Sequence, residues 1–494
     1  MKKTILFGIF YLMAVPSIFA GGILTNANQS AQYVRMLSRN ASVQVDAVYF
    51  NPAGVVKMED GFHFALNNQS IFQTKTIENR FPLLNASIYK GDVSVPVFPT
   101  GFAVYKKDKL ALSFGFGPNS GGGTAEYNTG LPSFETSIAQ IPLSLKASGI
   151  ETDAYSADLY FNGESVFWGG QLNMSWAFSE VVSGAVGVRV ILAGNDYQGH
   201  IKGVSVIKDG ESILVSDLMT GLAAQASAGA TAFSQQPANG QMPAAMAAQY
   251  GFPSGTTFGQ AAAVMSAKAA QATASAASAR DRQVDLKQKG TGFTPIIGLN
   301  IQPDEKLNIG LKYEFKTKLE MENHTEKDDL GVYPDGDKFR NDLPAIFTAG
   351  VDYKLLNNLK ISGSFNHYFD QSANMEGKED EIDKNLYELA LGMEYQLTEK
   401  TAVSAGIMHS ETGVGQGYQT DISYSLSSNT VGFGMQFHIN ERFDLDLGGL
   451  FTVYKPSDKE ITYKNGNKNL GTYKEIYSKT NLDFAIGLTY HLFN

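Results

Sequence analysis

The stretch TVGFGMQFHI, residues 430–439, decides the fold class of this chain of 494 residues. From Val431 to Ile439 every second residue is apolar, and the residues between them are polar or glycine. A short turn at 440–442 follows, and the same alternation then continues through 443–453. A period of two is typical of β-strands with one apolar face, so the segment predicts two antiparallel strands.

The same alternation recurs along the chain and predicts about fourteen strands. Each has about ten residues or more, which is the length that a tilted strand needs to cross a bilayer. The predicted strands are residues 61–72, 94–106, 109–117, 165–178, 181–206, 281–302, 306–324, 342–355, 358–372, 384–398, 401–413, 424–440, 443–456 and 479–493.

The connections between these strands fall into two alternating classes, which favours a membrane barrel over a soluble sandwich. Outer-membrane barrels have short periplasmic turns and long outer loops. The short connections are 106–108, 179–180, 303–305, 357–358, 399–400 and 440–442. The long ones are 73–93, 118–164, 207–280, 325–341, 373–383, 414–423 and 457–478, of which 118–164 and 207–280 are the largest.

Composition agrees with a chain built of strands. It has 31 Phe, 23 Tyr and 50 Gly but only 18% charged residues, and it has no Cys, so no disulfide framework is possible. The formal net charge of −10 argues against nucleic acid as a partner. The seven His are scattered and no hydrolase or nucleotide motif occurs, so we expect no enzyme activity, no cofactor and no metal.

The first residues have the pattern of an export signal. Lys2 and Lys3 precede an apolar run from Ile5 to Val15, and Ala20 offers a small residue for cleavage. The run is too short to span a bilayer as a helix, so residues 1–20 are predicted to be a signal peptide.

The faces of the predicted strands indicate a barrel with a polar interior. Inward positions include Ser183, Lys312, Glu314, Asp444 and Asp446, whereas the outward positions are mainly Leu, Val, Ile, Phe and Met. Closing the sheet removes its exposed edges. We therefore predict an all-β fold, a transmembrane antiparallel barrel over residues 55–494, with an N-terminal segment at 21–54 that occupies the lumen.

Two long loops differ in composition from the rest. Phe134, Ile138, Ile141 and Leu145 are spaced as in a short amphipathic helix broken near Pro142. Residues 218–280 are rich in Ala, Gln, Ser and Met, and 258–279 consist largely of good helix formers. One interpretation is a mobile low-complexity loop. The other is a set of short outer helices that present apolar surface for capture.

The chain resembles the FadL family of outer-membrane transporters for long-chain fatty acids and other hydrophobic compounds. The resemblance rests on Asn51-Pro52-Ala53 ahead of the first strand, with Asp46 before it. Further support comes from the Gly-rich strand end Phe114-Gly-Phe-Gly-Pro118 with 121–123, and from 290–293 followed by Gly298. It covers essentially the whole chain after the signal peptide, except that 218–280 has no residue-level match.

The resemblance implies a plug and a side opening. The plug would be residues 21–54, and its hinge would be formed by Asp46, Asn51, Pro52, Ala53 and Gly54. Family members also carry a kink in the third strand that opens the wall sideways. Here the corresponding gate residues would be Phe114, Gly115, Phe116, Gly117 and Pro118, because Gly weakens a strand and Pro cannot donate to the ladder. An ordinary exit from strand to loop is the alternative.

Arg189 is a candidate for binding the headgroup of a ligand. It lies on the inward face of a predicted strand, and a guanidinium can bind a carboxylate through two hydrogen bonds. The alternative is that it pairs with a carboxylate of the plug or wall.

We therefore expect a passive outer-membrane transporter. Hydrophobic molecules such as long-chain fatty acids would be captured by the outer loops and released sideways into the membrane. The expected surroundings are outer-membrane lipid and lipopolysaccharide, with the barrel-assembly machinery during biogenesis, and we expect a monomer. The alternatives are a general porin for small polar solutes and a surface adhesin or structural barrel.

Overall fold

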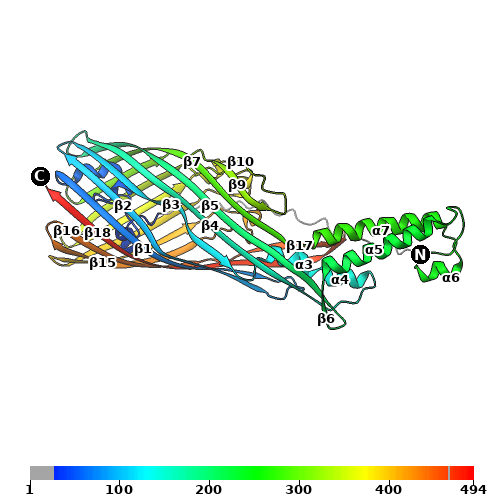
Figure 1. The fold of residues 1–494 in the computed structure, drawn as a ribbon. Coiled ribbons are helices and arrows are strands. Elements are labelled where there is room, and N and C mark those ends of the chain that lie inside the picture. The colour runs from blue at the N-terminus through cyan, green and yellow to red at the C-terminus, as the bar shows by residue number, and fades with distance from the viewer. Residues whose placement is uncertain (1–26, 466–467, 494) are drawn as a thin grey trace.

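The computed structural model describes residues 27–465 and 468–493. The predicted signal peptide, 1–20, lies outside the described residues. The strands form one antiparallel barrel of 14 strands, counted along its circumference. β1 pairs with β18 from Gly61↔Phe493 to Asn79↔Glu475, so the first and last strands close the sheet. The predicted fold class is thereby confirmed (Figure 1).

The 18 labelled strands reduce to these 14 because three positions in the wall are each shared by two consecutive strands, and β6 only extends one edge of β5. β8 and β9 both pair with β7. On their other side, β10 pairs with β9 and β11 pairs with β8. β16 and β17 both pair with β18. The strands are β1 (Gly61–Asn79), β2 (Ile88–Lys107), β3 (Leu110–Tyr127), β4 (Ala154–Ala177), β5 (Val182–Lys208), β6 (Glu211–Leu214), β7 (Arg282–Ile301), β8 (Leu307–Glu314), β9 (Glu320–Asp328), β10 (Lys338–Arg340), β11 (Ile346–Leu356), β12 (Leu359–Tyr368), β13 (Tyr387–Thr398), β14 (Thr401–Glu411), β15 (Ser428–Asn440), β16 (Phe443–Tyr454), β17 (Ser457–Asn465) and β18 (Lys468–Phe493).

Several strands run well beyond the predicted ends. β3 continues to Tyr127 and β4 begins at Ala154, so the connection predicted at 118–164 is in fact confined to 128–153. The prediction ended the third strand at Gly117 because Pro118 and the glycines after it interrupt the alternation. In the structure they form bulges within a continuing strand. β1 and β18 also extend together past the predicted limits.

The wall has the polarity of a barrel in lipid. Exposed apolar side chains form a belt around its outside, while buried polar side chains face the lumen. Members of the belt include Phe64, Leu66, Leu112, Phe114, Leu172, Met174, Val186, Val188, Phe293, Ile297, Leu391, Met393, Val431, Phe433, Phe484 and Ile486. Within the described part of the chain, no helix combines the length and apolar character that a membrane-crossing helix needs.

The helices lie inside the barrel and at its long-loop end. Inside are α1 (Ala31–Met36), α2 (Ala47–Phe50) and the 3₁₀ helix η1 (Pro52–Lys57). At the long-loop end are α3 (Pro132–Ala139), α4 (Ile141–Ala147), α5 (Val215–Ser234), α6 (Ala244–Gln249), α7 (Phe258–Ser278), η2 (Asp370–Ser372), η3 (Lys378–Glu381) and η4 (Gln416–Tyr418). The predicted outer helices are therefore confirmed.

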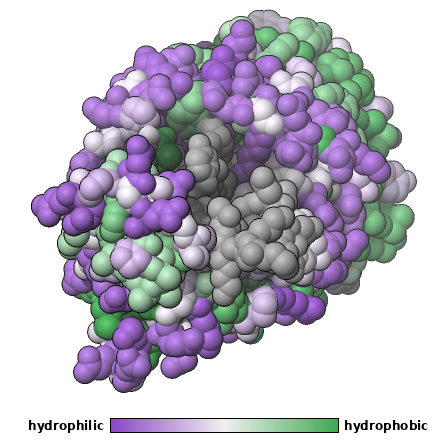
Figure 2. All heavy atoms as spheres, turned by 90° about the vertical axis from the view of Figure 1, so that its right-hand side faces the viewer, coloured by the Kyte–Doolittle hydropathy of each residue, from purple (hydrophilic) through white to green (hydrophobic). Residues whose placement is uncertain are grey.

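The long antiparallel pair α5 and α7 projects away from the barrel, with α6 at its tip (Figure 1). Thr257 caps α7 through a capping box with Gln260, which fixes the start of that helix. Figure 2 looks onto this end of the molecule and shows mainly hydrophilic residues, with hydrophobic ones in smaller groups. The outer end is therefore a predominantly polar surface.

Candidate functional site

The N-terminal residues 27–57, called the lumenal segment below, fill the inner half of the barrel. α1 contacts β13–β16, β18 and β1, while η1 contacts β3–β5, β7 and β8. Ser30 caps α1, because its Oγ accepts a hydrogen bond from Tyr33 N at 3.0 Å. Leu37 ends the helix in the left-handed conformation at φ 62°. These contacts on opposite sides of the wall hold the segment across the lumen.

Asp46 is the hydrogen-bonding centre of the lumenal segment. Its carboxylate accepts from Arg39 Nε at 2.8 Å and Nη2 at 2.7 Å, and from the hydroxyls of Ser30 at 2.9 Å and Ser42 at 2.7 Å. Burial alone would raise the pKa of Asp46, but the Arg39 charge and these hydrogen bonds hold it below its ordinary value. The carboxylate therefore stays ionised at neutral pH and ties both ends of the segment together.

Asn51-Pro52-Ala53 fastens the segment to the wall. Asn51 Nδ2 donates to Ser42 O at 3.0 Å and to Asn300 Oδ1 of β7 at 2.7 Å. The carbonyls of Pro52 and Ala53 accept from wall serines, Ser175 at 2.7 Å and Ser183 at 2.6 Å. A Cβ at Gly54 would lie 2.6 Å from Ser42 O, so this position needs glycine.

The structure thus brings the five predicted hinge residues, Asp46 and 51–54, into one buried region between segment and wall. Their role as a hinge stays a prediction.

A second ionic contact joins α1 to the opposite wall. Arg35 Nε lies 2.9 Å from Asp446 Oδ1, and its Nη1 lies 2.6 Å from Glu394 Oε2. The Ser404 hydroxyl accepts from the same Nη1 at 2.9 Å. Because charge pairs buried in this way are costly to break on one side, they favour the docked segment.

Arg189 is engaged within the wall in the described conformation. Its guanidinium donates to both oxygens of Glu314, at 2.6 and 3.0 Å, and to Gln171 Oε1. It also stacks over the ring of Tyr49 in the lumenal segment, with 4.8 Å from Cζ to the ring centroid. Lys312 Nζ lies 4.7 Å from the centroid of the same ring. A ligand carboxylate would have to displace Glu314, so the headgroup role of Arg189 stays a prediction.

The ladder between β2 and β3 is interrupted. The two strands pair from Lys107↔Leu110 to Gly101↔Phe116, and then only at Asp92↔Glu126. Proline explains part of the gap, because Pro96, Pro99 and Pro118 have no N–H to donate. β3 also has two bulges against β4 in this region. The predicted gate residues Phe114, Gly115, Phe116, Gly117 and Pro118 lie at the start of this interruption, and their role as a gate stays a prediction.

Side chains of β2 fill the interruption from the lumen side. Gly122 and Gly123 have φ of 127° and 105°, which side chains rarely tolerate. A Cβ at Gly122 would lie 2.7 Å from the Phe98 ring, and one at Gly123 would lie 2.7 Å from Val93. The glycine backbone therefore packs directly against these side chains, and the wall is closed in this conformation.

Gln29 of the lumenal segment bonds to both strands at the interruption. Its Nε2 donates to Pro118 O at 2.7 Å, and its backbone oxygen accepts from the Thr100 hydroxyl at 2.6 Å. The pairing that β2 and β3 lack is thus replaced in part by the segment. The segment therefore contacts both strands at once.

A cavity of about 190 Å³ lies where segment, wall and interruption meet. Tyr33 of α1 and the residue after the helix, Leu37, contribute from the lumenal segment, and Phe98, Gly121 and Gly122 from the interruption. The remaining lining is Ala27, Asn28, Ile71, Gln73, Glu388, Met408, Ser410, Ser428, Thr430, Leu450, Thr452, Tyr454, Asn481 and Asp483. This cavity is the candidate site, because the other described cavity that touches all three elements, lined among others by Gln29, Gly117 and Arg189, has a volume of only about 10 Å³.

Sequence reasoning missed several residues of this region. The alternation at 94–106 predicts an ordinary strand around Phe98, although Pro96 and Pro99 in one strand signal unpaired backbone. Lys75 and Lys479 face the lumen just beyond the cavity, and Lys75 lay in a predicted loop. Only the register of β1 against β18 brings these two lysines together.

The predicted capture residues are packed against other side chains. Ile138, Ile141 and Leu145 are buried in an apolar cluster with residues of β4, β5, α5 and α7, and Phe134 packs against it. Glu135 of α3 also accepts hydrogen bonds from Tyr89 and Tyr155. In this conformation the four side chains of α3 and α4 are therefore engaged in packing at the outer end. Capture by the four residues stays a prediction that needs these helices to move.

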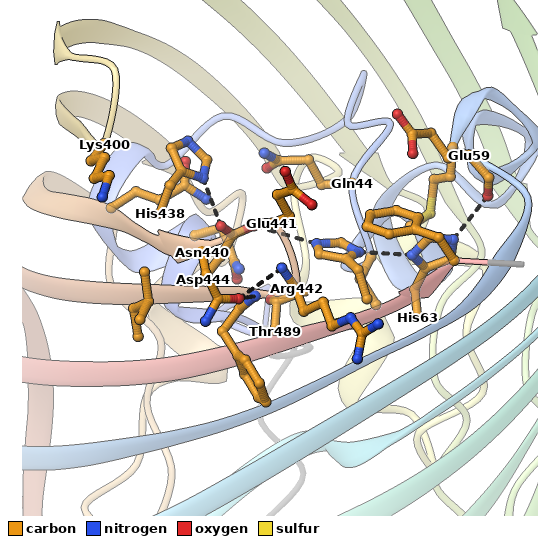
Figure 3. A pocket seen from close by; sticks show the side chains of 18 of the residues that line it. Gln44, Glu59, His63, Lys400, His438, Asn440, Glu441, Arg442, Asp444 and Thr489 are labelled. Atoms are coloured by element: carbon orange, nitrogen blue, oxygen red, sulfur yellow. Dashed lines mark hydrogen bonds and ion pairs between the residues drawn. The ribbon is translucent and has the colours of Figure 1, made fainter.

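A second cavity, of about 970 Å³, lies at the short-turn end and carries a chain of histidines (Figure 3). His63 Nδ1 lies 2.7 Å from His491 Nδ1, and His63 Nε2 lies 2.9 Å from Glu59 O. Asp444 accepts from His491 Nε2 at 3.3 Å and His438 Nδ1 at 2.6 Å. The two facing nitrogens can form a hydrogen bond only when one of them carries a proton. Over residues 27–465 and 468–493, no group of three His, Cys, Asp or Glu side chains could hold a metal ion.

The fold is that of known hydrophobic-compound channels. A Pseudomonas aeruginosa FadL homologue aligns over 95% of this chain and 99% of its own, with a TM-score of 0.59 and 12% identity. The Pseudomonas putida toluene transporter TodX aligns over 95% and 100%, with a TM-score of 0.53 and 11% identity. A TodX mutant described as a monoaromatic hydrocarbon channel gives 0.54 and 11% over the same shares. No family model and no curated protein matches the sequence.

Proposed function

We propose that this protein is an outer-membrane channel through which hydrophobic molecules diffuse passively and leave sideways through the wall between β2 and β3. The proposal is supported by the likeness in fold to the FadL homologue and to TodX, which is named a toluene transporter. It is also supported by the apolar belt around the barrel, which suits a lipid surrounding.

The observation that carries the proposal is the interruption between β2 and β3, with the cavity directly behind it. An intact barrel wall has every backbone group paired, since lipid offers no partner for a free N–H or C=O. Here eight residues of β2, 93–100, have no partner in β3. Three glycines of β3 face them, Gly117, Gly122 and Gly123. A wall that is weakest next to a cavity is suited to opening at that point.

In this proposal the lumenal segment acts as the plug. The segment is held to the wall by the ion pairs of Arg35. Its position is coupled to β2 and β3 by two hydrogen bonds, from Gln29 to Pro118 O and from Thr100 to Gln29 O. An apolar molecule gains free energy by leaving water for the membrane, so no other energy source is needed. The hinge at Asp46 and 51–54 would let the plug shift while it stays attached.

Two transport measurements test this function. Liposomes that contain the purified protein should not swell in isosmotic sugar, because the plug closes the aqueous route. Cells that express the protein in their outer membrane should accumulate radiolabelled alkylbenzene or alkanol several times faster than cells without it. Rapid sugar permeation would sink the proposal in favour of a general porin. Unchanged accumulation would favour a structural or adhesive barrel.

A further inference from the structure

The charged side chains that line the cavity behind the interruption are all negative. They are Asp483 of β18 and Glu388 of β13, which are buried, with exposed fractions of 1% and 7%. Among the described residues that line this cavity there is no Lys, Arg or His. A cavity lined by charges of one sign concentrates ions of the other sign, so this one attracts cations.

Asp483 has an oxygen without a partner. Within the described part of the chain, its Oδ1 accepts no hydrogen bond. Its Oδ2 accepts a long one, 3.4 Å from Asn28 Nδ2 of the lumenal segment, and that nitrogen lies closer to Gln69 Oε1, at 2.9 Å. Burying a carboxylate oxygen without a donor costs free energy, which a donor inside the cavity would recover.

Asn481 adds a second unpaired acceptor to the same wall. Its Oδ1 likewise has no hydrogen-bond partner within 27–465 and 468–493. Asn481 precedes Asp483 by two positions on β18, so both side chains lie on one face of the strand, about 7 Å apart along it. Both residues line the cavity. Two free acceptors, one of them charged, suit a ligand group with several N–H donors, and an ammonium group has three.

The other carboxylate of the cavity is already satisfied by neutral groups. Glu388 accepts hydrogen bonds from Asn366 Nδ2 at 2.9 Å, Tyr368 OH at 2.8 Å and Ser410 Oγ at 2.9 Å. Elsewhere in the lumen, buried carboxylates have cationic partners: Arg39 for Asp46, Arg35 for Asp446, and Arg189 with Lys312 for Glu314. Asp483 is therefore the position in the cavity where a ligand cation gains most.

Lys479 and its register partner Lys75 do not neutralise Asp483. Lys479 lies four residues from Asp483 along β18, which corresponds to about 13 Å. Its Nζ lies over the ring of Tyr454, 5.0 Å from the centroid. Within the described residues it forms no ion pair with Asp483 or Glu388. The partner of Asp483 Oδ1 must therefore come from outside the described chain.

The apolar part of the lining suits an aromatic ring. Asp483 is the register partner of Ile71 on β1 and of Leu450 on β16, and both line the cavity. Phe98 lines it from the side of the interruption. A cavity of about 150 Å³ holds one benzene ring, so the space of about 190 Å³ fits one ring that carries a short polar group.

We propose that this cavity binds a small aromatic amine as its cation, with the ammonium group between Asp483 and Asn481 and the ring toward Phe98. This inference rests on the proposed function and adds the class of ligand to it. The ammonium group donates to the two oxygens that have no partner in the chain. A carboxylate of the same size is excluded, because Asp483 and Glu388 repel it.

The test compares benzylamine, benzyl alcohol and benzoate, which share one ring and differ in charge. Binding to the purified protein is measured by calorimetry at pH 8 for the native chain and for Asp483→Asn, which removes the charge and keeps the shape. Asp458→Asn is the matched control, because its carboxylate lies on β17, outside the cavity, with a side chain 48% exposed.

We expect the native chain and the control to bind benzylamine at least about tenfold more tightly than benzyl alcohol, since hydrogen bonds between charged groups are stronger than neutral ones. Benzoate should bind more weakly than either. In Asp483→Asn the preference for benzylamine should fall to about twofold or less, with the binding of benzyl alcohol unchanged. This variant should melt at the native temperature or above it, because it removes a buried charge that has no cationic partner.

Three results would overturn the inference. The native chain binds benzyl alcohol or benzoate as tightly as benzylamine, which would show that water already meets the two free oxygens. The preference for benzylamine survives in Asp483→Asn, which would place the ammonium group elsewhere. Asp483→Asn melts well below the native protein, which would show that the carboxylate already has a stabilising partner.

Uptake of alkylbenzene by cells separates failure of this inference from failure of the proposed function. If alkylbenzene enters at the expected rate while benzylamine shows no preferred binding, the channel stands and the amine site is refuted. If neither alkylbenzene nor benzylamine enters faster than in cells without the protein, the channel itself is refuted.

Discussion

Replacing Asp46 by alanine measures how firmly the lumenal segment is docked. The substitution removes the acceptor of four hydrogen bonds and leaves the Arg39 guanidinium buried, at 2% exposure, without its counter-ion. Breaking one side of a buried charge pair costs about 3–5 kcal/mol. Because each 1.4 kcal/mol is a factor of ten, the undocked fraction should rise by about a hundredfold to several thousandfold.

Trypsin provides the assay, because the segment carries Arg35 and Arg39, both buried when it is docked. Cleavage of a transiently exposed site follows the population of the exposed state. We expect Asp46→Ala to be cut at Arg35 and Arg39 at least a hundredfold faster than the native protein, with higher conductance in planar bilayers. Glu59→Ala, at an exposed position just after the segment, should change the cleavage rate little, since surface substitutions usually stay within about 0.5 kcal/mol.

A second variant separates loss of the ion pair from loss of packing. In Asp46→Leu/Arg39→Met both charges are gone, and apolar replacement of a whole buried pair is often neutral or stabilising. Cleavage at Arg35 in this double variant should return toward the native rate. If Asp46→Ala is as resistant as the native protein, the segment is not held by this carboxylate and the reasoning fails.

Three further outcomes follow from the structure. Since the pKa of Asp46 lies below its ordinary value, the stability that its carboxylate gives to the docked segment is complete above about pH 4 and is lost as the pH falls through the lowered pKa. Proteolysis by an acid-stable protease should therefore show exposure of the segment only in strong acid. Gly117→Val would place its Cβ 2.8 Å from Thr100 and 2.9 Å from Gln29. It should therefore slow uptake of apolar compounds and lower the stability of the protein by about 1–3 kcal/mol. The control Gly170→Val, with open space around the new Cβ, should do neither. Replacing residues 224–269 by a short flexible linker should leave the barrel's melting temperature and uptake unchanged. The residues of this hairpin that pack on α3 and α4 are Val215, Met219, Ala276 and Ala279, which all lie outside the replaced part. A barrel that no longer folds would show that the outer hairpin is structural.

The barrel could be predicted from the sequence because its main determinant is local. Alternation from Val431 to Ile439 and in the other strands follows from a wall with lipid on one side and polar contacts on the other. The good helix formers of 258–279 do form a helix, α7, from Phe258 to Ser278, since alanine-rich sequence favours a helix wherever it lies.

The partners within the lumen could not be predicted, because they depend on how distant strands align. Arg189 was assigned inward correctly, but Glu314 becomes its partner only through the pairing of β5, β7 and β8. Lys75 and Lys479 are 404 residues apart and meet only because β1 closes on β18 in one register. The contact of Gln29 with Pro118 likewise requires the segment to fold into the lumen.

Exit through the wall between β2 and β3 is tested most directly by a reversible covalent link across the interruption. A Cβ at Gly123 would lie 3.8 Å from Val95 Cβ, the usual separation in a disulfide, and the chain has no other Cys. Because the φ of 105° at Gly123 disfavours a side chain, the reduced form of the variant is first required to take up apolar compounds at the native rate. In Val95→Cys/Gly123→Cys, oxidised protein should take up apolar compounds at least tenfold more slowly than the same protein after reduction. A link at Thr76→Cys/Lys90→Cys, where β1 and β2 pair continuously, should have no effect. Equal uptake by the oxidised and reduced forms of the first variant would contradict a lateral exit at this place.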